Sequence, residues 1–263
     1  MFPERTRALV LDGATSPNAT DEEQLLAQTQ GFEHTLTRFV AACDADRNCP
    51  LAPDTAGAIR AARERLTRRP VEVPASPAAA GGRTIGVDQF DVALATALYD
   101  TQLWGVTARA IDDLDGTGAT TLISLVDRQT GRNPDGSFDN SSDAQTMVNC
   151  ADSPERPTVD DATAISERVR AAAPTFGDAM SWSALSCLEW PEAANPMPVP
   201  TGAGSAPVLV VGTVGDPATP YVWSEQMADA LESAVLLTYE GSGHTAFLRG
   251  GECIDDAVIA YLV

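Results

Sequence analysis

Short, uninterrupted apolar runs alternate along the chain with longer segments of helical spacing. The apolar runs at 7–14 ("RALVLDGA"), 208–211 and 234–240 predict buried strands of a parallel sheet, because such strands are covered on both faces. In the longer segments, apolar residues recur every three or four positions, which predicts amphipathic helices. The clearest of these helices span 20–43, 55–69, 219–233 and 253–262.

The first of these helices has the most complete set of signals. Thr20 and Asp21 are candidate caps, and acidic residues occupy the first turn, where the helix dipole favours negative charge. His34, one of two histidines in the chain, lies off the apolar stripe, so we expect a surface or packing histidine rather than a catalytic one. The stripe itself consists of Leu25, Phe32, Leu36, Phe39 and Val40.

The middle of the chain has a different character. A connector rich in Pro, Ala and Gly at 73–82 precedes a stretch from 87 to 187 that is mostly helical. A polar loop at 130–143 interrupts it, and no strand pattern of comparable strength occurs there. We therefore expect a helical insertion rather than a continuation of the sheet.

Two polar residues of the tail follow strand ends. Asp216 comes just after the strand at 208–211, and His244 follows the strand at 234–240, with Gly243 allowing a tight turn before it. Ligands bind at this edge of an open parallel sheet. An acid followed by a histidine on consecutive strands is how α/β-hydrolases deliver two members of a Ser, Asp, His triad. The alternative for Asp216 is a turn-forming side chain before Pro217.

Composition narrows the classes of partner. The net charge of −20 makes nucleic acid and anionic membranes poor partners. The acidic excess indicates either a solvated surface or a preference for cationic ligands such as free peptide amines. All 17 basic residues are Arg, which excludes Schiff bases, Ser–Lys dyads and the phosphate-binding lysine of P-loops. We expect no cofactor and no metal.

The five cysteines give information about the cellular compartment of the protein. No apolar run approaches the roughly 18 residues of a membrane span, and the first residues do not form a signal peptide, which by itself indicates the cytoplasm. Pairing of Cys43 with Cys49 and of Cys150 with Cys187 would instead indicate an oxidising compartment and leave Cys253 over. Small buried free thiols are the alternative.

The tail resembles the C-terminal region of secreted actinobacterial tripeptidyl aminopeptidase-like hydrolases, relatives of proline iminopeptidase. The segments "GDPATP", "YEGSGHTA" and "C-IDDAV-AYL" carry the resemblance most closely. "FPERTRALVLDGA" is similar to the strand after the family's nucleophile helix, and "CDADRNCP" to its cysteine-bridged turn. "CAD" with "C-EWP" is similar to its helical lid. The resemblance covers nearly the whole chain and is weakest across 85–143.

The resemblance implies an α/β-hydrolase fold in its C-terminal portion. Residues 1–84 would be a remnant of the core, 85–190 a helical lid, and 191–263 the core segment with the triad acid and base. It implies catalytic roles for Asp216 and His244, the disulfides Cys43–Cys49 and Cys150–Cys187, a peptide substrate, and a secreted or cell-envelope location. We also consider Asp152 a candidate for binding the substrate amine, with a helix cap as the alternative.

One departure from the family concerns the nucleophile. The chain contains no G-x-S-x-G elbow, and Ser205 and Ser242 lie beside glycines but at no strand-to-helix turn. We therefore expect the C-terminal part of a serine aminopeptidase, inactive alone, whose serine lies in a missing N-terminal half. The alternative is a non-catalytic, truncated domain that acts only as a structural or complementing partner. Whether this chain alone is an enzyme is left open.

Overall fold

A parallel sheet brings the two ends of the chain together. The computed structural model describes residues 3–75, 82–193 and 198–263, and in this part the sheet has three strands in the order β1-β4-β5. They are β1 (Val10–Asp12), β4 (Val208–Gly215) and β5 (Ala234–Ser242), all parallel. The predicted strands are confirmed, and the fold is α/β, consistent with the α/β-hydrolase class.

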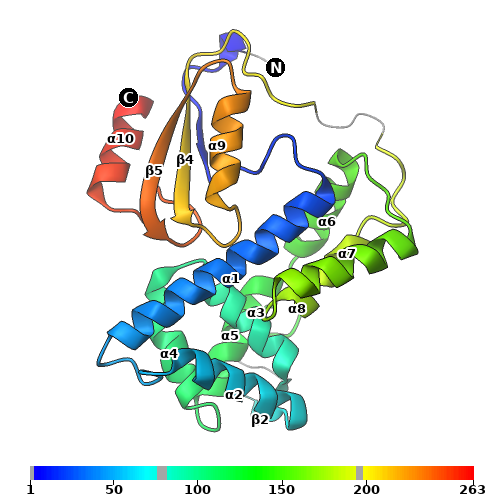
Figure 1. Cartoon of the computed structure of the whole chain (residues 1–263), viewed down its shortest axis with the longest axis vertical. Coiled ribbons are helices and arrows are strands. Elements are labelled where there is room, and N and C mark those ends of the chain that lie inside the picture. The colour runs from blue at the N-terminus through cyan, green and yellow to red at the C-terminus, as the bar shows by residue number, and fades with distance from the viewer. Residues whose placement is uncertain (1–2, 76–81, 194–197) are drawn as a thin grey trace.

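Apolar side chains of β4 alternate between the two faces of the sheet. The helices α9 (Tyr221–Ala230) and α10 (Glu252–Leu262) lie on opposite sides of it (Figure 1). Val208 and Val210 pack with Met227 of α9, while Leu209 and Val211 pack with Ile254 and Val258 of α10. Burial on both faces explains why the strand is an unbroken apolar run.

The remaining helices form a separate layer below the sheet in Figure 1. Their largest apolar cluster includes Phe39, Phe90, Leu94 and Phe176, all almost fully buried. The helices are α1 (Asp21–Ala45), α2 (Thr55–Arg68), α3 (Val87–Leu98), α4 (Trp104–Asp112), α5 (Gly118–Thr130), α6 (Ser141–Asp152), α7 (Val159–Ala172) and α8 (Gly177–Ser181). Short 3₁₀ turns occur at Pro3–Arg5, Thr101–Leu103 and Trp182–Leu185.

Helix α1 runs between the sheet and the other helices (Figure 1). It begins with a capping box, in which the Thr20 hydroxyl accepts the Glu23 N–H and the Glu23 carboxylate accepts the Thr20 N–H. Phe32, Leu36 and Phe39 of the predicted stripe are buried, and His34 is exposed.

A small antiparallel sheet departs from the sequence expectation. Strands β2 (Val71–Val73) and β3 (Arg83–Ile85) pair with each other, whereas we predicted only a connector at 73–82. Part of that connector, 76–81, lies outside the described residues. Each of the two strands has three residues, too few to show alternation, and each contains a polar residue, so neither forms an uninterrupted apolar run like the one around β1.

The proposed boundaries at 84 and 190 stay predictions. The expected core remnant and the expected lid share one apolar cluster, since Leu36 and Leu66 belong to it together with Phe90 and Leu122. In addition, β3 includes residue 84. Apolar packing in the described part of the chain is therefore continuous across position 84.

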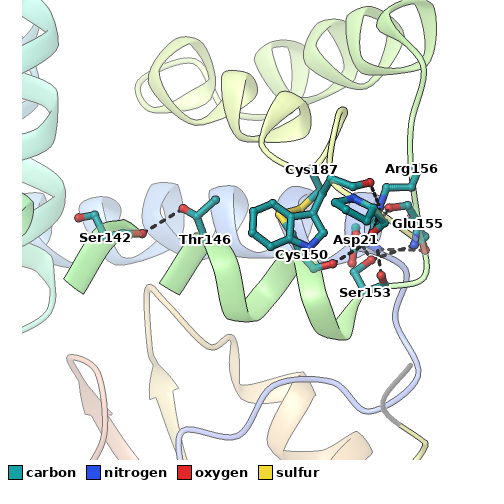
Figure 2. The surroundings of a disulfide bond; sticks show 10 residues. Asp21, Ser142, Thr146, Cys150, Ser153, Glu155, Arg156 and Cys187 are labelled. Atoms are coloured by element: carbon teal, nitrogen blue, oxygen red, sulfur yellow. Dashed lines mark hydrogen bonds between the residues drawn. A yellow bond between two sulfur atoms is a disulfide. The ribbon is translucent and has the colours of Figure 1, made fainter. Parts of the chain in front are cut away.

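Two disulfides are present, between Cys43 and Cys49 and between Cys150 and Cys187. Figure 2 shows the second, with Arg156 beside it. The Arg156 guanidinium donates to the carbonyl oxygens of Cys150 and Trp190, so it fastens α6 to the segment that follows α8. Cys253 is free and exposed. Disulfides are typical of proteins from oxidising compartments. Within the described ranges, no helix is long and apolar enough to cross a membrane.

We expect the two disulfides to stabilise the fold unequally. They close loops with sequence separations of 6 and 37, for which the loss of chain entropy in the unfolded state amounts to about 2 and about 4 kcal/mol. Replacing Cys150 and Cys187 by Ser should therefore lower the urea midpoint more than replacing Cys43 and Cys49. Cys253→Ser is the control and should leave it unchanged. Equal losses for the two pairs would contradict this account.

Candidate catalytic site at the sheet edge

The structure brings Asp216 and His244 together. Asp216 follows the last residue of β4, and His244 stands two residues beyond β5. Because the strands are parallel, both residues reach the same edge of the sheet. The imidazole Nδ1 lies 3.1 Å from each Asp216 carboxylate oxygen. Their predicted position is therefore correct, and their catalytic role stays a prediction.

The Asp216 carboxylate is buried but well supplied with donors. Its side chain is 1% exposed. Its Oδ1 accepts the backbone N–H groups of Ala218 and Thr219 at 2.9 and 2.8 Å, and its Oδ2 accepts that of Thr245 at 3.3 Å. A buried charge is tolerated only when hydrogen bonds replace its hydration, and these donors do so.

The contacts of the imidazole determine which ring nitrogen is free. Nδ1 faces the carboxylate, with the Thr219 hydroxyl 3.3 Å away, so we assign the proton to Nδ1. Nε2 then has a free lone pair, and no hydrogen bond to it occurs among the residues that the structure describes. The His244 side chain is 30% exposed, so the protein covers the ring only in part.

Tyr99, at the end of α3, holds the histidine from the helical layer. Its carbonyl oxygen accepts the His244 N–H at 2.9 Å, and its ring packs edge-on against the imidazole with centroids 5.5 Å apart. Burial, and to a lesser extent the charge of Asp216, raises the pKa of the Tyr99 phenol, which therefore stays neutral.

Asp12, at the end of β1, holds the loop after the histidine. Its carboxylate accepts the Ala246 N–H at 3.0 Å and the Phe247 N–H at 2.9 Å. We predicted no role for Asp12 from the sequence. An acid at the end of a strand, at the same sheet edge as Asp216, is the signal that could have identified it.

Helix α1 fixes the ends of both long strands. The Thr35 hydroxyl donates to the carbonyl oxygen of Gly215, and Arg38 Nε donates to the Ser242 hydroxyl at 2.6 Å. Gln28 donates to the carbonyl oxygen of Ala218 in the Asp216 loop. Three side chains of one helix thus hold the two loops in register with each other.

The loop backbone adopts conformations that few residues allow. Gly13 has φ +73°, and a Cβ there would lie 3.1 Å from His244 Cε1. Gly243 has φ +112°, and a Cβ would lie 3.0 Å from the Tyr99 carbonyl oxygen, so the predicted need for glycine is correct. Thr245 has φ +67°, an outlier for a β-branched residue beside the imidazole.

A cavity of about 170 Å³ opens beside the imidazole. Polar and charged side chains from α3, α5 and the segment after the histidine line it. The lining residues are Thr96, Tyr99, Arg128, Gln129, His244, Thr245 and Arg249. No group of three or more His, Cys, Asp or Glu side chains arranged to hold a metal ion occurs in the described ranges.

The other predicted site residues lie elsewhere. Asp152 is the last residue of α6 and is exposed, and the next residue, Ser153, contacts Asp21 at the start of α1. This is about two helical turns from Gln28, where α1 touches the Asp216 loop. Ser205 bonds to the neighbouring Ala206 carbonyl oxygen, and Ser242 is engaged by Arg38.

Comparisons with known proteins extend these observations. The family model described as TAP-like protein matches residues 173–263. The chain is 35% identical to serine protease Hip1 of Mycobacterium tuberculosis, over 100% of this chain and 52% of the relative. It is 32% identical to carboxylesterase B of M. tuberculosis, over 100% of this chain and 51% of the relative. It is 24% identical to tripeptidyl aminopeptidase of Streptomyces lividans, over 100% of this chain and 49% of the relative. The chain spans about half the length of these relatives.

We expect Asp12→Ala to loosen the histidine loop. Ala246 is fully buried, so removal of the carboxylate leaves a buried donor unpaired, at a cost of about 1–3 kcal/mol in unfolding free energy. Hydrogen exchange at the amides of Ala246 and Phe247 should accelerate. Asp256→Ala, at an exposed position of α10, is the control. Unchanged exchange at both amides would show that Asp12 does not hold the loop.

Proposed function

Because the chain belongs to the TAP-like family of α/β-hydrolases, we propose that it supplies the acid and base of a serine-hydrolase triad. Asp216 is the orienting acid and His244 the general base. The observation that carries the proposal is the imidazole itself, whose Nδ1 is bound to a buried carboxylate and whose Nε2 has no hydrogen-bond partner among the described residues.

In the proposed reaction, His244 Nε2 takes the proton of a serine hydroxyl as the serine attacks a substrate carbonyl. The same nitrogen then donates that proton to the leaving group. Asp216 fixes the tautomer and stabilises the imidazolium that forms between the two steps. Its backbone N–H donors keep the carboxylate aimed at Nδ1 throughout.

We propose that the serine comes from polypeptide outside these 263 residues. The sequence contains no G-x-S-x-G, and in the described part of the chain the imidazole has no serine partner. Strand β1 pairs with β4 on one side, and no described strand pairs with its other side. A parallel strand added there would end beside Gly13, whose position is next to His244 Cε1. The chain alone would then be inactive, acting as the complementing half.

We further propose a secreted peptidase that releases short N-terminal peptides, with residues 85–190 as a lid over the site. The two disulfides suit a location outside the cytoplasm. The names of two relatives, a serine protease and a tripeptidyl aminopeptidase, suit a peptide substrate. Asp152 would bind the substrate amine at the exposed end of α6, where Asp21 and Glu155 add acidic charge.

The two histidines of the chain provide a matched test in the full-length protein. His244→Ala should reduce kcat/KM for peptide hydrolysis roughly 10⁴-fold or more, because no base remains to activate the serine. His34→Ala, exposed on α1, should have no effect. Thermal unfolding of both variants serves as the folding control. Retention of activity in His244→Ala would overturn the proposed role.

Active-site labelling tests the source of the nucleophile. A fluorophosphonate probe should label the full-length protein at one serine and leave the 263-residue chain unlabelled. The chain mixed with its separately expressed N-terminal half should recover labelling if the two halves assemble. Stoichiometric labelling of the chain alone would show that the nucleophile lies within it.

A further inference from the structure

The cavity beside His244 has a composition that the proposed triad does not require. Arg128 and Gln129, at the end of α5, line it together with His244, and Arg249 joins them from the segment after the histidine loop. Among the described residues, no side-chain hydrogen bond or ion pair joins these three side chains to Asp216 or His244. Their positions make them contacts for a ligand.

The two guanidinium groups are only partly neutralised by the protein. Arg249 forms an ion pair with Asp100 at 3.8 Å, and the Arg249 side chain is half-exposed. Arg128 is exposed and forms no ion pair within the described ranges, because the adjacent Asp127 is bound by Arg83 at 2.6 Å and lies 3.9 Å from Arg132. The cavity therefore carries positive charge in a chain whose net charge is −20.

We propose that this cavity binds a carboxylate of the substrate on the leaving-group side of the scissile bond. This inference rests on the proposed function, in which His244 donates its proton to the leaving group. The leaving portion must then lie within hydrogen-bond reach of the imidazole, and the cavity is the space that the imidazole shares with the arginines. A guanidinium matches a carboxylate with two parallel hydrogen bonds, whereas Gln129 suits either an acid or an amide.

The carboxylate has two possible sources, and peptide variants separate them. It is either the side chain of an acidic residue directly after the scissile bond or the free C-terminus of a short leaving peptide. Four peptides share their first three residues and continue with Glu or Gln, each ending in a free acid or an amide. Wild-type full-length protein should cleave at least one acid-bearing form about tenfold faster in kcat/KM than the neutral Gln amide, which corresponds to ~1.4 kcal/mol.

Arg128→Gln should abolish this discrimination, and Arg60→Gln, an exposed arginine of α2, should preserve it. The preference should also weaken with added salt, because the cavity is open to solvent. An active wild-type enzyme that cleaves all four peptides equally would overturn the inference while leaving the proposed function intact. So would an acid preference that survives in Arg128→Gln.

A binding measurement on the full-length protein tests the cavity independently of turnover. Acetyl-Glu-amide and acetyl-Gln with a free C-terminus should shift the imidazole NMR signals of His244 saturably, and acetyl-Gln-amide should not. Comparison with His244→Ala identifies the His244 signals, because only those signals disappear in that variant. If no peptide is hydrolysed but the acidic probes bind through Arg128, the proposed function fails and the carboxylate site stands. If no acidic probe shifts the signals, the site is refuted.

Discussion

The parallel pairing of β4 with β5 is the constraint on which the candidate site depends. Parallel strands end at the same edge of a sheet, so Asp216 and His244 meet although 28 positions separate them in the chain. In the observed register, Val208 pairs with Ala234 and Thr213 with Tyr239, and the side chains of β4 pack against α9 on one face and α10 on the other. Packing of valines and leucines therefore determines where the carboxylate and the imidazole lie.

Irregular loops after the strands need partners that the strands cannot supply. Backbone N–H groups in such loops do not take part in the hydrogen bonds between strands, and buried N–H groups need other acceptors. Two carboxylates meet this need, since Asp216 accepts from Ala218, Thr219 and Thr245, and Asp12 accepts from Ala246 and Phe247. The same bonds hold Thr245 in its unfavourable backbone conformation. Main-chain hydrogen bonds to the two carboxylates thus hold the loop that carries the imidazole, and the edge-on Tyr99 ring packs against the imidazole itself.

Charge acts on two scales in this protein. The acidic excess of the whole chain disfavours anionic surfaces, and we took it to favour cationic ligands as one alternative. Beside His244 the local balance is reversed, because Arg128 and Arg249 line the cavity. At moderate ionic strength, screening limits the reach of exposed charges to about 8–10 Å. A ligand in the cavity therefore interacts with the nearby arginines more than with the net charge of the chain.

The sequence by itself determined the helices, the three long apolar runs of the sheet, and the placement of Asp216 and His244 beyond strand ends. These features depend on periodicity and order within about 30 residues, which local patterns record. Strands β2 and β3 were not predicted, because three residues that include a polar one show neither an apolar run nor a clear alternation. Tertiary structure alone decided the roles of Asp12, Tyr99, Arg38 and the cavity arginines. Asp12 meets Ala246 across 234 positions, and Arg38 meets Ser242 across 204. Contacts of that separation leave no pattern in the chain, because they exist only once the sheet has brought its two ends together.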